Sequence, residues 1–259
     1  METRRPVFAV LSLYLLLTAC ATAPNFHMLE EARPHLDQVD VFLVVAQDEI
    51  YAQIDQSNVA AAMGGGLIPA LIDAAVESSR TKTAEQMMQP IRDGLINFDY
   101  AQVLADALDA GLKGVSWLHA GNLKLLRSDE KDQLQNLYNN SSASAILYIT
   151  GDYSLSANMH SAVTVVNLAL YPKSESLFTY REKPDKNGKP VDLSDNIYRN
   201  RVEHASILIS DPDKKPEESA QMLADEGPGR IIDALNANAR QVADLVKQDI
   251  AVPGSRDKK

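Results

Sequence analysis

The residue with the most distinctive chemistry in this sequence is Cys20, the only cysteine of the chain. A thiolate can act as a nucleophile, bind a metal ion or form a disulfide. A single cysteine excludes an intrachain disulfide. Cys20 directly follows Leu17, Thr18 and Ala19. Its place behind small residues near the start of the chain favours modification of the thiol over catalysis.

Residues 1–19 have the layout of an export signal. Arg4 and Arg5 give a basic start, residues 7–17 form an uncharged apolar run, and small residues precede Cys20. This three-part order is typical of a secretory signal peptide. The apolar run is too short to cross a bilayer, which takes about 20 apolar residues. We therefore expect residues 1–19 to be a signal peptide and not a transmembrane helix.

The sequence Leu17-Thr18-Ala19-Cys20 resembles the lipobox of bacterial lipoproteins. The resemblance implies that the Cys20 thiol receives a diacylglycerol and that a peptidase cuts between Ala19 and Cys20. The new amino terminus would then be acylated, with palmitate or a similar chain. Several chains on one residue would anchor the protein, whereas one chain alone binds a membrane only marginally. Enterobacterial lipoproteins kept in the inner membrane have Asp at the next position, so Ala21 favours the periplasmic side of the outer membrane.

The five histidines stand in no metal-binding or catalytic motif, and we expect each to be structural or exposed. They are His27, His35, His119, His160 and His204. The sequence has no nucleophile elbow, P-loop, dinucleotide-binding fingerprint or EF-hand loop. Asp211-Pro212-Asp213 is interpreted as a solvated turn, since Lys214 and Lys215 would repel a cation. We therefore expect no catalytic residues, no metal and no cofactor, although scattered carboxylates could still meet in the folded chain.

The most unusual segment is Gly64-Gly65-Gly66, flanked by Ala60, Ala61 and Ala62. One interpretation is a small-residue contact surface, between subunits or against lipid, where two backbones approach closely. The other is a flexible lead into a helix starting near Leu67, because each glycine costs a helix roughly 1 kcal/mol. Residues 57–83 are therefore treated as a Gly/Ala-rich insert whose three glycines are a candidate interaction surface.

The composition narrows the classes of partner. The full chain has a net charge of −10, and removal of the basic signal makes the mature chain slightly more negative. An acidic balance argues against nucleic acid and against anionic lipid surfaces as ligands. The mature chain is long enough to bury a core and needs no disulfide for stability.

Hydrophobic periodicity predicts one α+β domain over residues 39–250. Cys20 and a tether to residue 38 precede it, and residues 251–259 are expected to be a disordered tail. Strands are predicted at 39–46, 145–150, 163–171 and 197–209, with a weaker one at 118–126 and a hairpin strand at 176–181. Helices are predicted at 67–76, 83–97, 99–111, 129–138 and 229–250. Adjacent strands joined by short loops pair antiparallel, so we expect a mostly antiparallel sheet of about five strands with helices on one face.

The order of these elements is similar to a group of periplasmic modules. The group includes the N-terminal domain of the Tol propeller protein, the curli-secretion lipoprotein and the lipoproteins that activate penicillin-binding proteins. The similarity lies in the opening strand 39–45, the strand 145–151 after a helix, and the segment 163–180. It implies a non-enzymatic role as an envelope assembly, scaffolding or transport-accessory module that contacts an envelope protein or a second copy.

Two other functions stay open on the sequence alone. One is a periplasmic hydrolase whose site is assembled from scattered residues, and the other is a carrier of a small ligand or lipid. A hydrolase would need clustered acids in a pocket, and a carrier would need a large apolar cavity.

Overall fold

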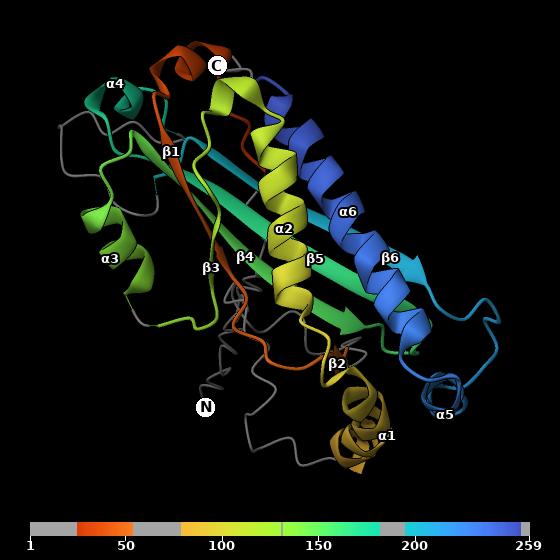
Figure 1. Cartoon of the computed structure of the whole chain (residues 1–259). Helices are drawn as coiled ribbons and strands as arrows, with labels where there is room; N and C mark the ends of the chain where they lie inside the picture. Colours follow the sequence, from red (N-terminus) through yellow and green to blue (C-terminus); the bar gives the residue numbers. More distant parts are fainter. Residues whose placement is uncertain (1–24, 54–78, 131, 182–194, 255–259) are drawn as a thin grey trace, which may run out of the picture.

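The computed structural model describes residues 25–53, 79–130, 132–181 and 195–254 of the chain (Figure 1). Ala19, Cys20 and Gly64–Gly66 lie outside these ranges, as does the helix predicted over residues 67–76. The insert assigned to residues 57–83 lies mostly outside them, but helix α1 already begins at Ser79.

A mixed sheet forms the centre of the described fold. Its strands are β1 (Val39–Val44), β2 (Tyr51–Ala52), β3 (Lys124–Leu126), β4 (Ala145–Leu155), β5 (Ser161–Pro172) and β6 (Tyr198–Ile207). They lie in the order β3-β1-β4-β5-β6, and β2 pairs with β4 beyond the end of β1. Strands β4, β5 and β6 form long antiparallel ladders, whereas β1 runs parallel to β3 and β4. The predicted α+β class, with a mostly antiparallel sheet, is confirmed.

The interior position of β1 follows from its composition. Val41 and Leu43 face the helices, Phe42 and Val44 face the other side, and all four side chains are buried. A strand buried on both faces is expected to be apolar throughout and to pair in parallel when helices connect it to its neighbours. Helices do separate β1 from both of its parallel partners.

The helical elements are η1 (Glu30–His35), α1 (Ser79–Leu95), α2 (Tyr100–Lys113), η2 (Ser116–Leu118), α3 (Gln133–Asn140), α4 (Glu175–Phe178), α5 (Pro216–Glu226) and α6 (Gly229–Ala251). Helices α2 and α6 lie side by side across one face of the sheet (Figure 1). A Cβ atom on Gly111 of α2 would lie 3.2 Å from the Ala243 carbonyl oxygen of α6. Small residues at this crossing therefore let the two helices approach closely.

The long C-terminal helix is confirmed, and its apolar stripe faces the sheet. The stripe residues buried in the core are Ile231, Leu235, Ala239, Val242, Val246 and Ile250. One polar residue differs from the prediction. Helical periodicity assigns an asparagine to the polar side of such a helix, but Asn238 is 0% exposed.

The hairpin predicted between residues 163–171 and 176–181 is wrong. Residues Glu175–Phe178 form the short helix α4, and both edges of β5 pair with other strands, β4 and β6. The backbone N–H groups of Lys173 and Ser174 both bond to the Ser144 carbonyl oxygen, which turns the chain away from the sheet. Phe178, Thr179 and Tyr180 favour strands by propensity, but tertiary context overrides that preference.

Two further segments differ from the sequence prediction. Helix α5 is absent from the predicted helices; it begins at Pro216, soon after the turn predicted at residues 211–213, with Glu217 and Glu218 in its first turn. Proline and acidic residues are both favoured at a helix start, so a signal for α5 was present. The weaker strand at 118–126 is reduced to β3, the last three of those residues.

The described part of the predicted tether is folded onto the domain. Phe26 exchanges two backbone hydrogen bonds with Arg199 at the edge of β6, and Met28 and Leu36 are buried in the core. The N–H of Gly254 donates to the Met28 carbonyl oxygen, so the chain beyond α6 also packs here. Residues 25–38 and 252–254 therefore pack against the domain, because the apolar side chains of this stretch have a core to enter.

Candidate functional site

The sheet has an interruption between β1 and β2, and a glutamine side chain closes it. Both strands pair with β4, but residues 45–50 between them leave the ladder. The Gln47 side chain accepts a hydrogen bond from the Tyr153 N–H at 3.1 Å and donates to the Tyr153 carbonyl oxygen at 2.6 Å. This carboxamide therefore takes the place of a strand residue beside Tyr153. The loop it supports carries Asp48 and Glu49 outward.

A pocket of about 220 Å³ lies between this loop and the end of α1, and we call it the acidic pocket. It is lined by Asp48, Glu49, Ile50, Arg92, Asp93, Leu95, Ile96, Phe98, Tyr153 and Leu235. The polar part of the lining has three carboxylates and one guanidinium. The rest is apolar or aromatic. A polar mouth over apolar walls is a common arrangement at binding sites.

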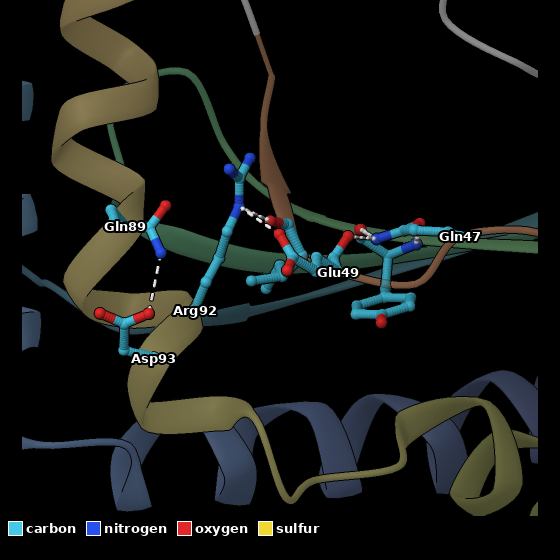
Figure 2. Close-up of polar contacts among 7 residues, drawn as sticks. Gln47, Glu49, Gln89, Arg92 and Asp93 are labelled. Atoms are coloured by element: carbon cyan, nitrogen blue, oxygen red, sulfur yellow. Dashed lines mark hydrogen bonds and ion pairs between the residues drawn. The ribbon is translucent and has the colours of Figure 1, made fainter.

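Arg92 joins α1 to the loop that carries the acids. Figure 2 shows its side chain reaching from the helix to Glu49. The Arg92 Nε donates to the Ile50 carbonyl oxygen at 3.0 Å and lies 3.4 Å from the Glu49 carboxylate. The Arg92 side chain is mostly buried, whereas Glu49 is mostly exposed. The one cation of the pocket is therefore held in a structural contact.

Asp93, next along α1, is held by a second short contact. Gln89 donates from its amide nitrogen to the Asp93 carboxylate at 2.8 Å, one helical turn away (Figure 2). Asp48 is exposed and makes no hydrogen bond or ion pair with any residue in the described ranges. The mouth of the pocket thus keeps an excess of negative charge.

Two aromatic residues, Phe98 and Tyr153, line the acidic pocket, and the buried ring of Tyr100 packs near both of them. The rings of Tyr100 and Tyr153 lie with their centroids 4.7 Å apart, and Phe98 lies 6.1 Å from Tyr100. At the rim, Ile96 is 81% exposed. Because Ile96 also lines the pocket, its side chain extends the apolar wall out to the surface.

The phenol of Tyr153 is the most unusual group in the lining. Tyr153 is only 7% exposed. Its hydrogen bonds within the described residues all use backbone atoms, and none of those residues pairs with its hydroxyl. Burial, together with the charges of Asp48 and Asp99, raises the pKa of Tyr153 to about 12, although Arg127 acts in the opposite direction. The hydroxyl stays protonated and faces a negative field.

An ion pair lies beside the pocket. Asp99 caps α2 by accepting from the Gln102 N–H at 3.0 Å and binds Arg127 at 2.6 Å. The Arg127 guanidinium lowers the pKa of Asp99, helped by the cap, although burial acts in the opposite direction. This pair fixes the start of α2 and neutralises its own charge.

The arrangement suits binding of a cation better than catalysis. Within the described residues, no serine, cysteine or lysine nucleophile lies beside a base in this lining. No group of three histidine, cysteine or acidic side chains in those ranges is placed to hold a metal ion. A positively charged organic group on an apolar stem would match both the mouth and the walls.

A second hollow of about 420 Å³ lies near the other end of α6. It is lined by Gly114, Val115, Ser116, Trp117, Asp244, Lys247, Gln248 and Ala251. Its charged residues, Asp244 and Lys247, have opposite signs, so it shows no preference for a charged ligand. The acidic pocket is the better candidate.

The residues that the sequence analysis singled out do not meet at either hollow. Ring nitrogens of His119 and His160 lie 2.7 and 3.1 Å from backbone carbonyl oxygens. His27 and His35 lie against tyrosine rings, and His204 is half-buried on β6. Each histidine is therefore placed by local packing.

The acidic pocket itself was missed from the sequence. Gln47, Asp48 and Glu49 directly follow the apolar run of β1, and polar residues after the carboxyl end of a parallel strand often form binding sites. That signal was available. The contribution of Tyr153 was not, because it lies more than one hundred residues further along the chain.

Comparisons with known proteins add little. No protein-family model and no curated protein matches the chain. Among solved structures, it is similar to a Xanthomonas campestris protein of the family model DUF330, with a TM-score of 0.30 and 7% sequence identity. The similarity covers 88% of this chain and 89% of that one. A similarity of this strength supports no conclusion about function. In the ranges that the structure describes, no helix is both long and apolar enough to cross a bilayer.

Proposed function

We propose that this chain is an envelope lipoprotein, anchored through Cys20 at the periplasmic side of the outer membrane. Its domain would act there as a non-catalytic assembly, scaffolding or transport-accessory module. The observation that carries the proposal is the sequence Leu17-Thr18-Ala19-Cys20 behind a basic start and a short apolar run. The physical basis is that acyl chains on Cys20 would hold an otherwise polar domain at a lipid surface.

The chemistry of the acidic pocket supports a binding role. Arg92 is engaged by Glu49 and a backbone carbonyl, and Gln47 is engaged by the backbone of Tyr153. These groups position the loop, so they are not poised to attack or protonate a substrate. What the pocket offers to a ligand is negative charge, one phenol and an apolar wall. Such features recognise a partner without changing it.

The test is substitution of the only cysteine. We expect Cys20→Ser to prevent lipidation, so that an uncut precursor or a mislocalised protein accumulates. Mass spectrometry of the amino-terminal peptide and separation of inner and outer membranes would measure both effects. Ala21→Asp is the matched control. It should leave lipidation intact and move the protein towards the inner membrane. Cut, outer-membrane protein from Cys20→Ser would refute the anchor.

A further inference from the structure

We propose that the acidic pocket binds a lysine or arginine side chain of a partner protein, with an apolar neighbour of that residue packing on Ile96. The inference deepens the proposed function, because it names the chemistry of the partner that an envelope module would hold. It rests on four features of the pocket: charge, an unpaired phenol, size and the exposed rim.

The charge of the pocket calls for a cation. Asp48, Glu49 and Asp93 line it, against the single guanidinium of Arg92. That guanidinium is already held by Glu49 and the Ile50 carbonyl. Asp48 has no partner among the described residues, so its carboxylate is available to an incoming ammonium or guanidinium. Hydrogen bonds between charged groups are the stronger kind.

The hydroxyl of Tyr153 supplies a second contact. Its ring is 7% exposed, and no described residue bonds to the oxygen. The hydroxyl oxygen itself is not fully buried, so a ligand in the pocket can reach it. A ligand N–H donor would use the phenol oxygen as acceptor, while the O–H could still donate to a carboxylate. A cation in the pocket would therefore contact both the Tyr153 hydroxyl and a carboxylate.

The size of the pocket excludes larger ligands. At about 220 Å³ it lies below the 300–1,000 Å³ that is usual for drug-sized ligands and cofactors. It suits one long side chain. The walls of Ile50, Leu95, Phe98 and Leu235 are apolar, and lysine and arginine stems bury their methylene groups along such surfaces while the charged head meets polar groups.

The rim points to a protein as the source of that side chain. Ile96 is 81% exposed and lines the same pocket, so it can cover the residue next to the inserted one. A free amine would gain nothing from this contact. A central anchor in a pocket, surrounded by an apolar contact that excludes water, is the usual form of a protein–protein hot spot.

The first test uses side-chain analogues on the full mature protein in detergent, with tyrosines labelled by 13C at Cζ. Butylammonium and butylguanidinium stand for lysine and arginine, and 1-butanol and butyrate are the uncharged and negative controls. At constant ionic strength we expect the two cations to shift the Tyr153 signal saturably, with a Kd on the order of 1–10 mM. If 1-butanol shifts it equally, or if neither cation shifts it, the cation site is refuted.

Two variants test whether the cations that shift the NMR signal bind in the acidic pocket. Asp48→Asn and Tyr153→Phe each remove one proposed contact, and we expect each to weaken the cations about tenfold. Amide signals of the loop at residues 47–50 report binding when Tyr153 is absent. Asp213→Asn removes an exposed carboxylate in a different loop and should leave the Kd unchanged. Equal weakening by Asp213→Asn would mean non-specific charge attraction and refute the site.

The second test addresses the partner. A photo-crosslinking amino acid replaces Ile96 in cells, and the crosslinked peptides are sequenced. We expect crosslinks to fall within a few residues of a lysine or arginine whose change to glutamine abolishes the crosslink. Crosslinks that do not depend on a basic residue would refute a protein source. Cation binding needs no lipid, so loss of the Cys20 anchor with intact cation binding would reject only the proposed function.

Discussion

Two neighbouring tyrosines, one in the core and one in the candidate site, differ in the hydrogen bonding of their hydroxyl groups. Tyr100 and Tyr153 have ring centroids 4.7 Å apart, and both are largely buried. The Tyr100 hydroxyl shares a hydrogen bond of 2.6 Å with the Thr164 hydroxyl inside the core. The Tyr153 hydroxyl opens on the acidic pocket and has no partner among the described residues. The same residue type thus serves packing in one place and recognition in the other.

The Tyr100 hydroxyl belongs to a set of hydrogen-bonded polar groups in and beside the core that we call the core polar cluster: Tyr100, Thr164, Ser206, Asn238 and the Ala162 carbonyl. Asn238 donates to the Ala162 carbonyl oxygen at 2.8 Å and accepts from Ser206 at 2.6 Å. These bonds join α6 to β5 and β6. A fully satisfied buried network fixes one arrangement of its elements, whereas a hydroxyl without a protein partner at a pocket is free to bond to a ligand.

The largest effect should come from breaking the core polar cluster at its centre. Asn238→Ala removes three contacts and takes from the Ser206 hydroxyl its acceptor under α6. We expect a loss of about 2–3 kcal/mol in the free energy of unfolding, measured by denaturant melts. Asn236→Ala, two residues away on the same helix and not fully buried, is the control. Equal losses from both variants would contradict a special role for the cluster.

The sequence predicted the elements of this region better than their polar contacts. The apolar spacing of residues 229–250 predicted α6 and the face that it buries. Asn238 could not be identified as buried, because helical periodicity treats a lone asparagine as part of the polar side. Only the neighbouring strands, which supply Ala162 and Ser206, make its burial possible. Buried polar partners come from tertiary packing, which a local pattern does not contain.

The acidic pocket was harder to predict for a different reason. Its acids come from the loop after β1, its guanidinium from α1 and its phenol from β4. The alternating pattern predicted the strand that carries Tyr153 only as far as residue 150. Whether a tyrosine hydroxyl is paired or free depends on which side chains reach it in space. The loop acids could therefore be recognised in the sequence as candidates for a site, whereas the role of the Tyr153 phenol could not.

An effect of intermediate size is expected at Asp152, whose carboxyl group should make the stability of the fold depend on pH. Asp152 precedes Tyr153 on β4 and faces the opposite side of the sheet. Burial raises its pKa from 3.8 to about 6, although Arg201 acts in the opposite direction. A raised carboxyl pKa stabilises the fold fully below about pH 4, and this contribution is lost as the pH rises to 6.

Asp152→Asn removes this pH dependence. We expect the variant to be more stable than the parent by about 1–2 kcal/mol above pH 6, after allowing for partial solvent exposure, and equal to it below pH 4. Denaturant melts across pH 4–8 would measure the difference. A constant difference at every pH would show that the side chain acts through packing. Then the pH response of the domain would have to come from groups other than Asp152.

The smallest changes in stability are expected from Tyr100→Phe and Tyr153→Phe, and the difference between these two variants tests whether the two hydroxyl groups have different roles. Tyr100→Phe removes a buried hydrogen bond with Thr164 and should lower the free energy of unfolding by about 1–1.5 kcal/mol. Tyr153→Phe removes a hydroxyl that bonds to no described residue, so the change should stay within about 0.5 kcal/mol. Both rings keep their apolar contacts, so the difference between the variants isolates the two oxygens. If Tyr153→Phe costs as much as Tyr100→Phe, its hydroxyl is a structural group of the folded domain. The distinction between a core tyrosine and a recognition tyrosine would then fail, and the case for a cation in the acidic pocket would rest on charge and shape alone.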